Sequence, residues 1–246
     1  MSKLYKELAE VYEAMYQTFI DYKEEYDFYS GLLEKYNKNQ VLEIGCGTGH
    51  LANYFAKNGF EYIGMDLSEE MIQLAKNKAH TSQFIKGDMR DFKINSPLQS
   101  VIITARTISY LSSNKDVKAT FSSIFNNLQS EGILCFDFID ANAFIPLMAK
   151  KKEVVHEATF RNIHYIRKSK WDLNLKHGMD FNWNAVYYKK DGDHLIEIGQ
   201  DQSIIRTFTI NEIEVFLFIN GFKIKEIIER ASYFFPTYVV VAERVN

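Results

Sequence analysis

The sequence predicts an α/β fold: a doubly wound, mostly parallel sheet of seven strands with an antiparallel β insertion. Between residues 40 and 138, short apolar runs alternate with amphipathic segments, which is typical of parallel strands joined by helices. The runs are apolar throughout because strands of such a sheet are buried on both faces. After about residue 139 the pattern changes, and within residues 153–208 apolar and polar side chains alternate in several stretches, which indicates antiparallel strands.

The 246 residues are expected to form one domain, residues 1–246, in four parts. Residues 1–37 carry apolar side chains at three- and four-residue steps and predict two N-terminal helices. Residues 38–140 form the core of the domain, residues 141–208 form the β insertion, and residues 209–246 form a closing helix with two strands.

The core is expected to contain five strands and three helices. The strands are 40–44, 61–66, 83–86, 99–105 and 132–138, and the helices are 50–58, 69–78 and 115–128. Gly59 is a natural stop for the first of these helices, and Ser68 is a good N-cap for the second.

The later segments show alternating and helical patterns in turn. Alternation at 164–168, 179–188 and 194–198 predicts strands, and Asp191-Gly192 favours a hairpin turn between the last two. A helix over 211–220 is expected to be capped by Thr209 or Asn211 and to end at Gly221. The two closing strands are then 222–227 and 237–242.

A glycine-rich stretch, Gly45-Cys46-Gly47-Thr48-Gly49, joins the first strand to the first helix of the core. Glycine permits positive φ and close approach of a ligand to the backbone, and the next helix begins with unpaired N–H groups. Ligands of open α/β sheets lie at the carboxyl ends of the strands, where this stretch is placed. Its G-x-G-x-G spacing differs from the G-x-G-x-x-G of dinucleotide-binding folds. We therefore expect a different nucleotide-like ligand.

Acidic residues lie at the ends of three successive strands: Glu43, Asp66 and Asp88. The Asp66 carboxylate can accept hydrogen bonds from both hydroxyls of a ribose, as acidic residues do in dinucleotide folds. Asp88 can meet the amino group of an adenine. Three carboxylates at one edge would repel a pyrophosphate. They suit a ligand that has no phosphate and carries a positive sulfonium.

These motifs resemble the class I S-adenosylmethionine-dependent methyltransferases. The resemblance rests on residues 41–49, on Asp66-Leu67-Ser68-Glu69-Glu70-Met71 and on Gly87-Asp88-Met89, and it extends over residues 38–140. Residues 87–92 and the β insertion also resemble a small bacterial branch that includes N,N-dimethyltransferases of nucleotide-linked amino sugars. The resemblance implies a Rossmann-like methyltransferase fold, S-adenosyl-L-methionine as the cofactor, and the β insertion as a substrate cap.

The resemblance also implies which residues bind the cofactor: Tyr12, Tyr16, Glu43, Gly45, Gly47, Gly49, Asp66, Leu67, Met71, Asp88, Met89, Thr104 and Arg106. The three glycines would line the methionine and ribose, and Asp66 would hold the ribose hydroxyls. Asp88 and Met89 would contact the adenine, with Leu67 or Met71 packed near it. Thr104, Ala105 and Arg106 would border the sulfur and the acceptor. Tyr12 and Tyr16, with Tyr22 as a further candidate, would close over the methionine end.

The sequence leaves the catalytic residues unassigned, with Tyr12, Arg106 and Asp137 as candidates. Asp137 and Asp140 are expected just past the fifth strand, where a carboxylate could orient an amine, take its proton or cap a turn. In the variable part of the chain, five residues either contact the acceptor or fill the core of the cap: His164, Trp171, Trp183, Arg206 and Tyr233.

Charge and cysteine content narrow the function classes. The net charge of −3 disfavours nucleic acid as the main partner. The basic clusters Lys150-Lys151-Lys152 and Arg167-Lys168 are expected on a solvated rim. Cys46 and Cys135 have no C-x-x-C partner and no histidine pair has metal-ligand spacing, so neither a disulfide nor a metal site is expected. The absence of a signal peptide and of an apolar run of about 20 residues predicts a cytoplasmic protein without membrane contact.

We therefore expect a methyltransferase that acts on a nitrogen or oxygen of a small-molecule acceptor, as a monomer or a homodimer. Three alternatives stay open. The acceptor could be a nucleic acid or a protein, which a continuous basic surface would favour. The chain could instead be a non-catalytic module that senses the cofactor. A dehydrogenase is the third alternative, which the glycine spacing disfavours.

Overall fold

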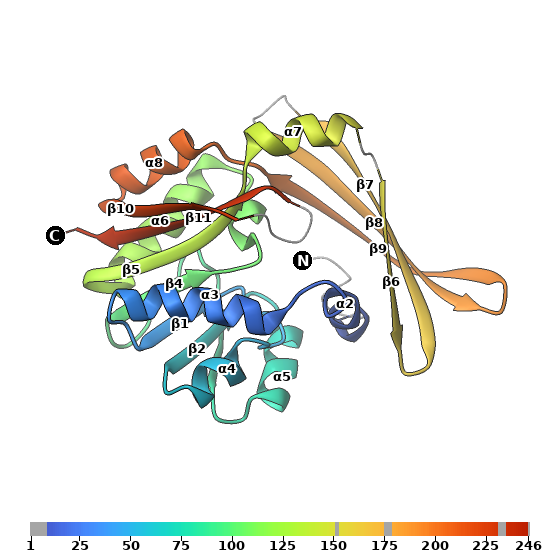
Figure 1. Cartoon of the computed structure of the whole chain (residues 1–246), viewed down its shortest axis with the longest axis horizontal. Coiled ribbons are helices and arrows are strands. Elements are labelled where there is room, and N and C mark those ends of the chain that lie inside the picture. The colour runs from blue at the N-terminus through green and yellow to red at the C-terminus, as the bar shows by residue number, and fades with distance from the viewer. Residues whose placement is uncertain (1–8, 151–152, 175–178, 231–234, 246) are drawn as a thin grey trace.

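The computed structural model describes residues 9–150, 153–174, 179–230 and 235–245, which form two β-sheets with flanking helices (Figure 1). The larger sheet has seven strands in the order β10-β11-β5-β4-β1-β2-β3. The smaller sheet has four strands in the order β6-β7-β8-β9. In Figure 1 the smaller sheet stands apart from the larger one, and α7 and α2 lie between the two.

The larger sheet is mostly parallel. Its strands are β1 (Gln40–Ile44), β2 (Glu61–Asp66), β3 (Gln83–Lys86), β4 (Leu98–Ile103), β5 (Leu128–Ile139), β10 (Phe222–Glu229) and β11 (Thr237–Arg244). The strands from β1 to β5 pair in parallel, whereas β11 runs antiparallel to both of its neighbours, β5 and β10. The predicted seven-stranded, mostly parallel sheet is therefore confirmed.

Helices cover both faces of this sheet. They are α3 (Tyr22–Lys35), α4 (Ala52–Lys57), α5 (Glu69–Lys78), α6 (Asn114–Asn127) and α8 (Ile210–Ile219). Val41 packs in the core that contains α3, α4 and α5, and its neighbour Leu42 packs in the core that contains α6 and α8. Since successive strand residues point to opposite faces, the two cores require the continuous apolar runs seen in the sequence.

Local signals place the ends of two helices. The Ser68 hydroxyl accepts the N–H of Met71 and starts α5, as predicted. For α8 the sequence left two candidate caps, and the structure uses Thr209. Its side chain accepts the N–H of Glu212, while the Glu212 carboxylate accepts the Thr209 N–H.

None of the described helices has the length and apolar composition that crossing a membrane requires.

The insertion forms the four-stranded sheet, here called the cap: β6 (Glu153–Phe160), β7 (Ile163–Asn174), β8 (Asp180–Asp191) and β9 (His194–Arg206). All of its neighbouring strands are antiparallel, and the β8–β9 hairpin turns at Gly192, as predicted. The helix α7 (Ala141–Lys150) precedes the cap and is absent from the prediction, because Pro146 inside it argues against a helix. The Asp140 carboxylate accepts the N–H groups of Asn142 and Ala143, so this residue caps α7.

The N-terminal helix α2 (Ala9–Tyr16) connects the cap to the larger sheet. Its residues Val11 and Met15 pack in one cluster with Tyr165 and Tyr187 of the cap. On its other side, the Glu13 carboxylate contacts His50 and Lys78. His50 directly follows the glycine stretch, and Lys78 is the last residue of α5. The helix therefore lies over the carboxyl edge of the larger sheet, beside the cap (Figure 1).

Candidate active site

The glycine stretch leaves β1 where the strand order reverses, between β1 and β4. Gly45, Gly47 and Gly49 all have positive φ, at 76°, 52° and 75°. A Cβ at Gly45 would lie 2.6 Å from Thr107, and one at Gly49 would lie 3.0 Å from Ala75 and Phe84. A Cβ at Gly47 would meet no atom within 4 Å. The outer two glycines thus serve close packing within the protein, whereas the space beside Gly47 is open, and we call it the cradle.

The Asp66 carboxylate lies at the rim of this cradle. It accepts the N–H of Gly47 at 2.9 Å and the N–H of Ser68 at 2.8 Å, one on each oxygen. Burial raises the pKa of Asp66, and the backbone hydrogen bonds from Ser68 and Gly47 oppose that rise. The backbone N–H of Leu67 also donates to this carboxylate. Its two oxygens have about four lone pairs, so acceptor capacity remains beside these donors. The pair of oxygens beside an open backbone fits a ribose diol.

The third feature of the loop is Glu43, which is buried beneath it. Its carboxylate accepts the Tyr62 hydroxyl at 2.5 Å and the Thr104 hydroxyl at 3.0 Å. Burial raises the pKa of Glu43 to about 7, although the two hydroxyl donors lower it. The hydroxyl of Thr104, a residue expected to border the ligand, donates to Glu43. The pair fixes the end of β1 against the end of β4.

Glu43 makes folding stability depend on pH. Because folding raises the carboxyl pKa from 4.5 to about 7, the folded chain keeps a proton that the unfolded chain releases in this window. The free energy of unfolding should therefore fall as pH rises from 4.5 to about 7, by about 3 kcal/mol from this group. Glu43→Gln should remove this group's part of the fall, whereas the part due to Asp137, whose pKa burial also raises, should remain.

Urea unfolding at about pH 5 and about pH 8 measures this effect. The control is Glu61→Gln on the neighbouring strand, where the carboxyl group is exposed. That variant should keep the pH dependence of the wild type. An unchanged pH dependence in Glu43→Gln would show that Glu43 does not titrate as described.

The connection from β4 to the short 3₁₀ helix η1 (Thr107–Tyr110) is strained. Ala105 and Arg106 both have left-handed backbone, with φ of 53° and 60°. For residues other than glycine this costs about 1–3 kcal/mol each, and such strain is concentrated at functional sites. The Asp137 carboxylate accepts the Arg106 N–H at 2.7 Å and holds this turn in place.

Asp137 lies inside β5, as the predicted strand 132–138 implies, and not just past it. β11 pairs with the carboxyl-terminal part of β5, with Val239 opposite Asp137. Burial raises the pKa of Asp137 to about 6, while the neighbouring Arg106 lowers it. The carboxylate is therefore enclosed and already holds a backbone N–H, as a group that positions the Arg106 turn would be.

N-terminal tyrosines lie near the glycine stretch. The Tyr22 ring stacks on His50, the residue after Gly49, with ring centroids 3.9 Å apart. Burial raises the pKa of Tyr22, and the nearby tyrosine and carboxyl groups, Tyr16 and Glu43 among them, raise it further. Tyr12 and Tyr16 stack on each other on α2, at 4.0 Å between centroids. Tyr22 therefore contacts the residue that directly follows the glycine stretch.

The residues expected near the adenine separate into two groups. Leu67 exposes 49% of its surface beside Asp66, whereas Met71 is buried and Met89 packs against the core. Asp88 already accepts the Arg90 guanidinium, with Nη2 at 2.5 Å, and this hydrogen bond lowers the pKa of Asp88. An adenine amino group would have to share Asp88 with Arg90. Leu67 is the apolar surface on which a flat ring can rest.

The candidates in the cap also differ in position. Trp171 and Trp183 stack at 5.5 Å between centroids on the face that turns toward α2 and α7. His164 lies on the opposite, solvated face and contacts Glu157. Arg206 is buried in an ion pair with Glu212, which gives it a structural role. Tyr233 lies outside the described residues.

Arg167 is the functional candidate that the sequence missed. With Lys168 it was expected on a solvated rim, but Arg167 is only 4% exposed. In β7 the odd-numbered residues Tyr165, Ser169 and Trp171 are buried as well. The available signal was therefore this alternation, which puts a charge among inward-facing positions.

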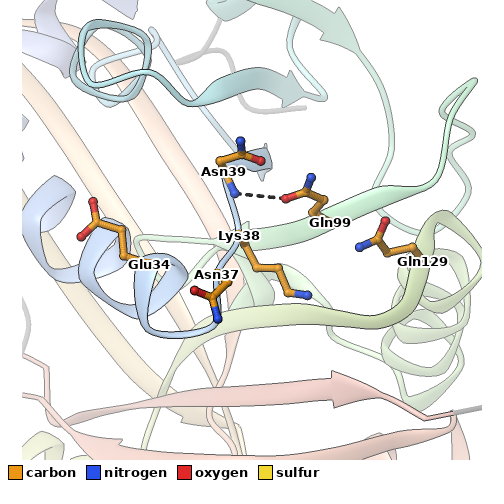
Figure 2. A pocket seen from close by; sticks show the side chains of 6 residues that line it. All are labelled: Glu34, Asn37, Lys38, Asn39, Gln99 and Gln129. Carbon is orange, nitrogen blue, oxygen red and sulfur yellow. Dashed lines mark hydrogen bonds between the residues drawn. The ribbon is translucent and has the colours of Figure 1, made fainter.

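A polar pocket occurs at the other edge of the larger sheet. Figure 2 shows the residues that line it: Glu34, Asn37, Lys38, Asn39, Gln99 and Gln129. Asn39 and Gln99 lie at the amino ends of β1 and β4, far along the strands from the glycine stretch. Within the described ranges, no group of three or more His, Cys, Asp or Glu side chains could hold a metal ion.

Comparison with known proteins gives a consistent result. Residues 41–132 match a family described as a methyltransferase domain. The provisionally named methyltransferase YqeM of Bacillus subtilis (strain 168) is 34% identical over 202 residues, which are 77% of this chain and 76% of YqeM. A Streptomyces venezuelae enzyme, dTDP-3-amino-3,4,6-trideoxy-alpha-D-glucopyranose N,N-dimethyltransferase, is 27% identical over 96 residues, or 39% of this chain and 40% of that enzyme.

A solved structure extends the likeness to the whole fold. The S-adenosylmethionine-bound CalS10, an amino pentose methyltransferase from Micromonospora echinaspora, superposes with a TM-score of 0.78 at 19% identity. The match covers 96% of this chain and 97% of CalS10, so it includes the cap. With a seven-stranded sheet, a glycine cradle beside Asp66 and relatives of this kind, the chain belongs to the S-adenosylmethionine-dependent methyltransferases.

Proposed function

We propose that the chain transfers a methyl group to a nitrogen or oxygen of a small-molecule acceptor that lies between the glycine stretch and the cap. The observation that carries the proposal is the position of α2 and the cap over the carboxyl edge of the sheet, next to the open cradle at Gly47. A site covered on this side suits a small molecule. The net charge of −3 gives no general attraction for nucleic acid.

The described residues fit the cofactor on three counts. Gly47 leaves space against bare backbone, Asp66 offers two acceptor oxygens for ribose hydroxyls, and Leu67 offers an apolar surface for the adenine. When bound, S-adenosylmethionine supplies a methyl group that is already activated by the sulfonium. The protein's task is therefore mainly to align the donor and the acceptor and to exclude water.

Arg106 and Tyr12 stay as candidates for contact with the acceptor. Asp137 we assign instead to positioning, because its carboxylate is buried and holds the Arg106 N–H. The names of the Streptomyces enzyme and CalS10 concern amino sugars, which supports an amine as the acceptor. An amine must lose its proton before it can be methylated, and a base can assist without being essential.

Asp137→Asn distinguishes positioning from base catalysis. The amide still offers an oxygen to the Arg106 N–H, so kcat should fall by less than about tenfold. Loss of a general base should lower it by about 10²–10⁴-fold. The pH profile of kcat/KM should also keep its acidic limb in the variant if Asp137 is not the base, and disappearance of that limb would assign Asp137 as the base.

The test of the function is transfer of labelled methyl groups from S-adenosylmethionine to a panel of acceptors. The panel should hold nucleotide-linked amino sugars, small amines, small alcohols, transfer RNA and a protein extract. Labelling of a small molecule is the expected result. Labelling of only the RNA or the protein fraction would favour a macromolecular acceptor, and cofactor binding without any labelling would favour a sensing module. A cytoplasmic location, and a monomeric or dimeric state, are part of the same proposal.

A further inference from the structure

Arg167 carries a buried charge in the cap. Its side chain is on β7, on the face of the cap that turns toward α2. The guanidinium donates to Nδ1 of His156 at 2.9 Å and lies 5.4 Å from the centroid of the Tyr16 ring. In the part of the chain that the structure describes, it makes no ion pair. Buried arginine without an anionic partner is unusual, because removing its charge from water costs several kcal/mol.

Arg206, on the neighbouring part of the cap, shows how this chain satisfies a buried arginine. It is buried to a similar degree and donates to the Glu212 carboxylate at 3.1 Å and to the Asn114 amide oxygen at 2.7 Å. Two aromatic rings also lie against its guanidinium. Arg167 has the aromatic contact but lacks the carboxylate. The anion that would complete the site is therefore absent from the described protein.

Other donors without partners gather around Arg167. The Ser169 hydroxyl, the Trp171 indole N–H and Arg167 Nε are buried and have no hydrogen-bond partner among the described residues. The Tyr187 hydroxyl oxygen lies within hydrogen-bonding reach of the Arg167 guanidinium and keeps its own O–H to donate. They share one face because Arg167, Ser169 and Trp171 are alternate residues of β7, and Tyr187 is opposite Arg167 on β8. Such polar groups are normally satisfied in a folded protein. A surface rich in donors suits a ligand group rich in acceptors.

The face is connected to the cofactor edge from two sides. Arg167 lies over the ring of Tyr16, which is close enough to Tyr22 to raise its pKa. Tyr22 in turn stacks on His50, the residue after the glycine stretch. On the other side, the Arg106 guanidinium lies 4.7 Å from the Phe235 ring, which in turn contacts Trp183 of the cap. The donors thus belong to the side of the site where the acceptor is expected.

We propose that the inner face of the cap binds an anionic group of the methyl acceptor, a phosphate or a carboxylate, with Arg167 as its main contact and the Ser169 and Tyr187 hydroxyls as further donors. This rests on the proposed function, since the ligand is the acceptor. A guanidinium presents a fork of N–H groups that matches both kinds of anion. The acceptor is then an anionic metabolite whose nucleophilic nitrogen or oxygen reaches toward Arg106 while its charge is held at Arg167.

The test measures thermal unfolding of the protein saturated with S-adenosylhomocysteine. Inorganic phosphate and acetate are added separately, and sodium chloride of the same ionic strength is the reference. At least one of the two anions should raise Tm above the reference, and the better one identifies the group. In Arg167→Gln the apparent affinity for that anion should fall by about tenfold or more, and Arg167→Lys should keep part of it because the charge remains without the fork.

Lys170→Gln is the matched control. It removes the same charge from the same strand, but its side chain is on the solvated face and contacts Glu153. It should keep the full response to the anion. If Arg167→Gln does not fold, Tyr187→Phe replaces it, since the ring stays and only the hydroxyl is lost; its response should be weaker than that of the wild type.

Two results would overturn the inference. One is a wild type that responds to phosphate and acetate no more than to chloride. The other is an equal response in the wild type and in the folded variant, Arg167→Gln or Tyr187→Phe. Binding of S-adenosylhomocysteine is measured in the same samples. If it binds and the anions do not, only the anion site is wrong; if it does not bind, the proposed function fails independently.

Discussion

Gly47→Ala is expected to weaken S-adenosylmethionine binding by about 10- to 100-fold while the protein stays folded. The added methyl group would occupy the space against which the cofactor is expected to lie, because no protein atom is within 4 Å of it. Overpacking of a fitted site costs about 1–3 kcal/mol, which corresponds to this loss of affinity. The positive φ of Gly47 adds a cost of about 1 kcal/mol to folding.

Gly59→Ala separates these two effects. Gly59 has a φ of 84°, and a Cβ there would also meet nothing within 4 Å, but it ends α4 away from the cradle. Both variants should lose a similar amount of folding stability, measured by urea unfolding. Calorimetric titration should show lost affinity only in Gly47→Ala. Equal cofactor affinity in the two variants would mean that the space at Gly47 is not part of the cofactor site.

Asp66→Ala is expected to weaken cofactor binding by at least about tenfold. The variant loses the acceptor oxygens for the ribose, and hydrogen bonds to charged groups contribute about 1.5–3 kcal/mol each. It also removes the partner of the Gly47 N–H, which the carboxylate holds at 2.9 Å. Glu69→Ala is the control, because it removes an exposed carboxylate three residues away in the first turn of α5.

A cofactor analogue that lacks the ribose 2′-hydroxyl makes the test specific for the ribose. The wild type should bind this analogue more weakly than S-adenosylhomocysteine. Asp66→Ala should bind the two almost equally, because the group that recognises the hydroxyl is gone. If the variant discriminates as strongly as the wild type, Asp66 contributes through the loop backbone and not through the ribose.

Local sequence patterns were sufficient for the elements that position the cofactor. The predicted limits of β1, β2, β3 and α5 match the structure, because short apolar runs and a Ser68 cap define them within a few residues. Local patterns were insufficient where pairing with a distant strand sets the surroundings of a residue. β5 was expected over 132–138 and runs from Leu128 to Ile139. The antiparallel pairing of β11 with its carboxyl-terminal part places Asp137 inside the sheet.

In the candidate site too, some residues could be identified from local sequence and others depend on distant contacts. The three glycines follow the first strand of the core and Asp66 ends the second, so the sequence alone could propose them. That Gly47 is the open one depends on Thr107, Ala75 and Phe84, which fill the space beside the other two. Arg167 was misplaced on the surface because its burial depends on α2, which covers that face from more than a hundred residues away in the sequence.

The central claim is that the cofactor lies against Gly47 and Asp66, with its methyl end toward the cap. A crystal structure of the chain with S-adenosylhomocysteine tests it most directly. The account predicts the ribose hydroxyls on the Asp66 carboxylate, the adenine on Leu67, and the sulfur between Arg106 and the inner face of the cap. A ligand bound at the amino ends of the strands, in the polar pocket near Asn39 and Gln99, or one whose ribose does not contact Asp66, would contradict it.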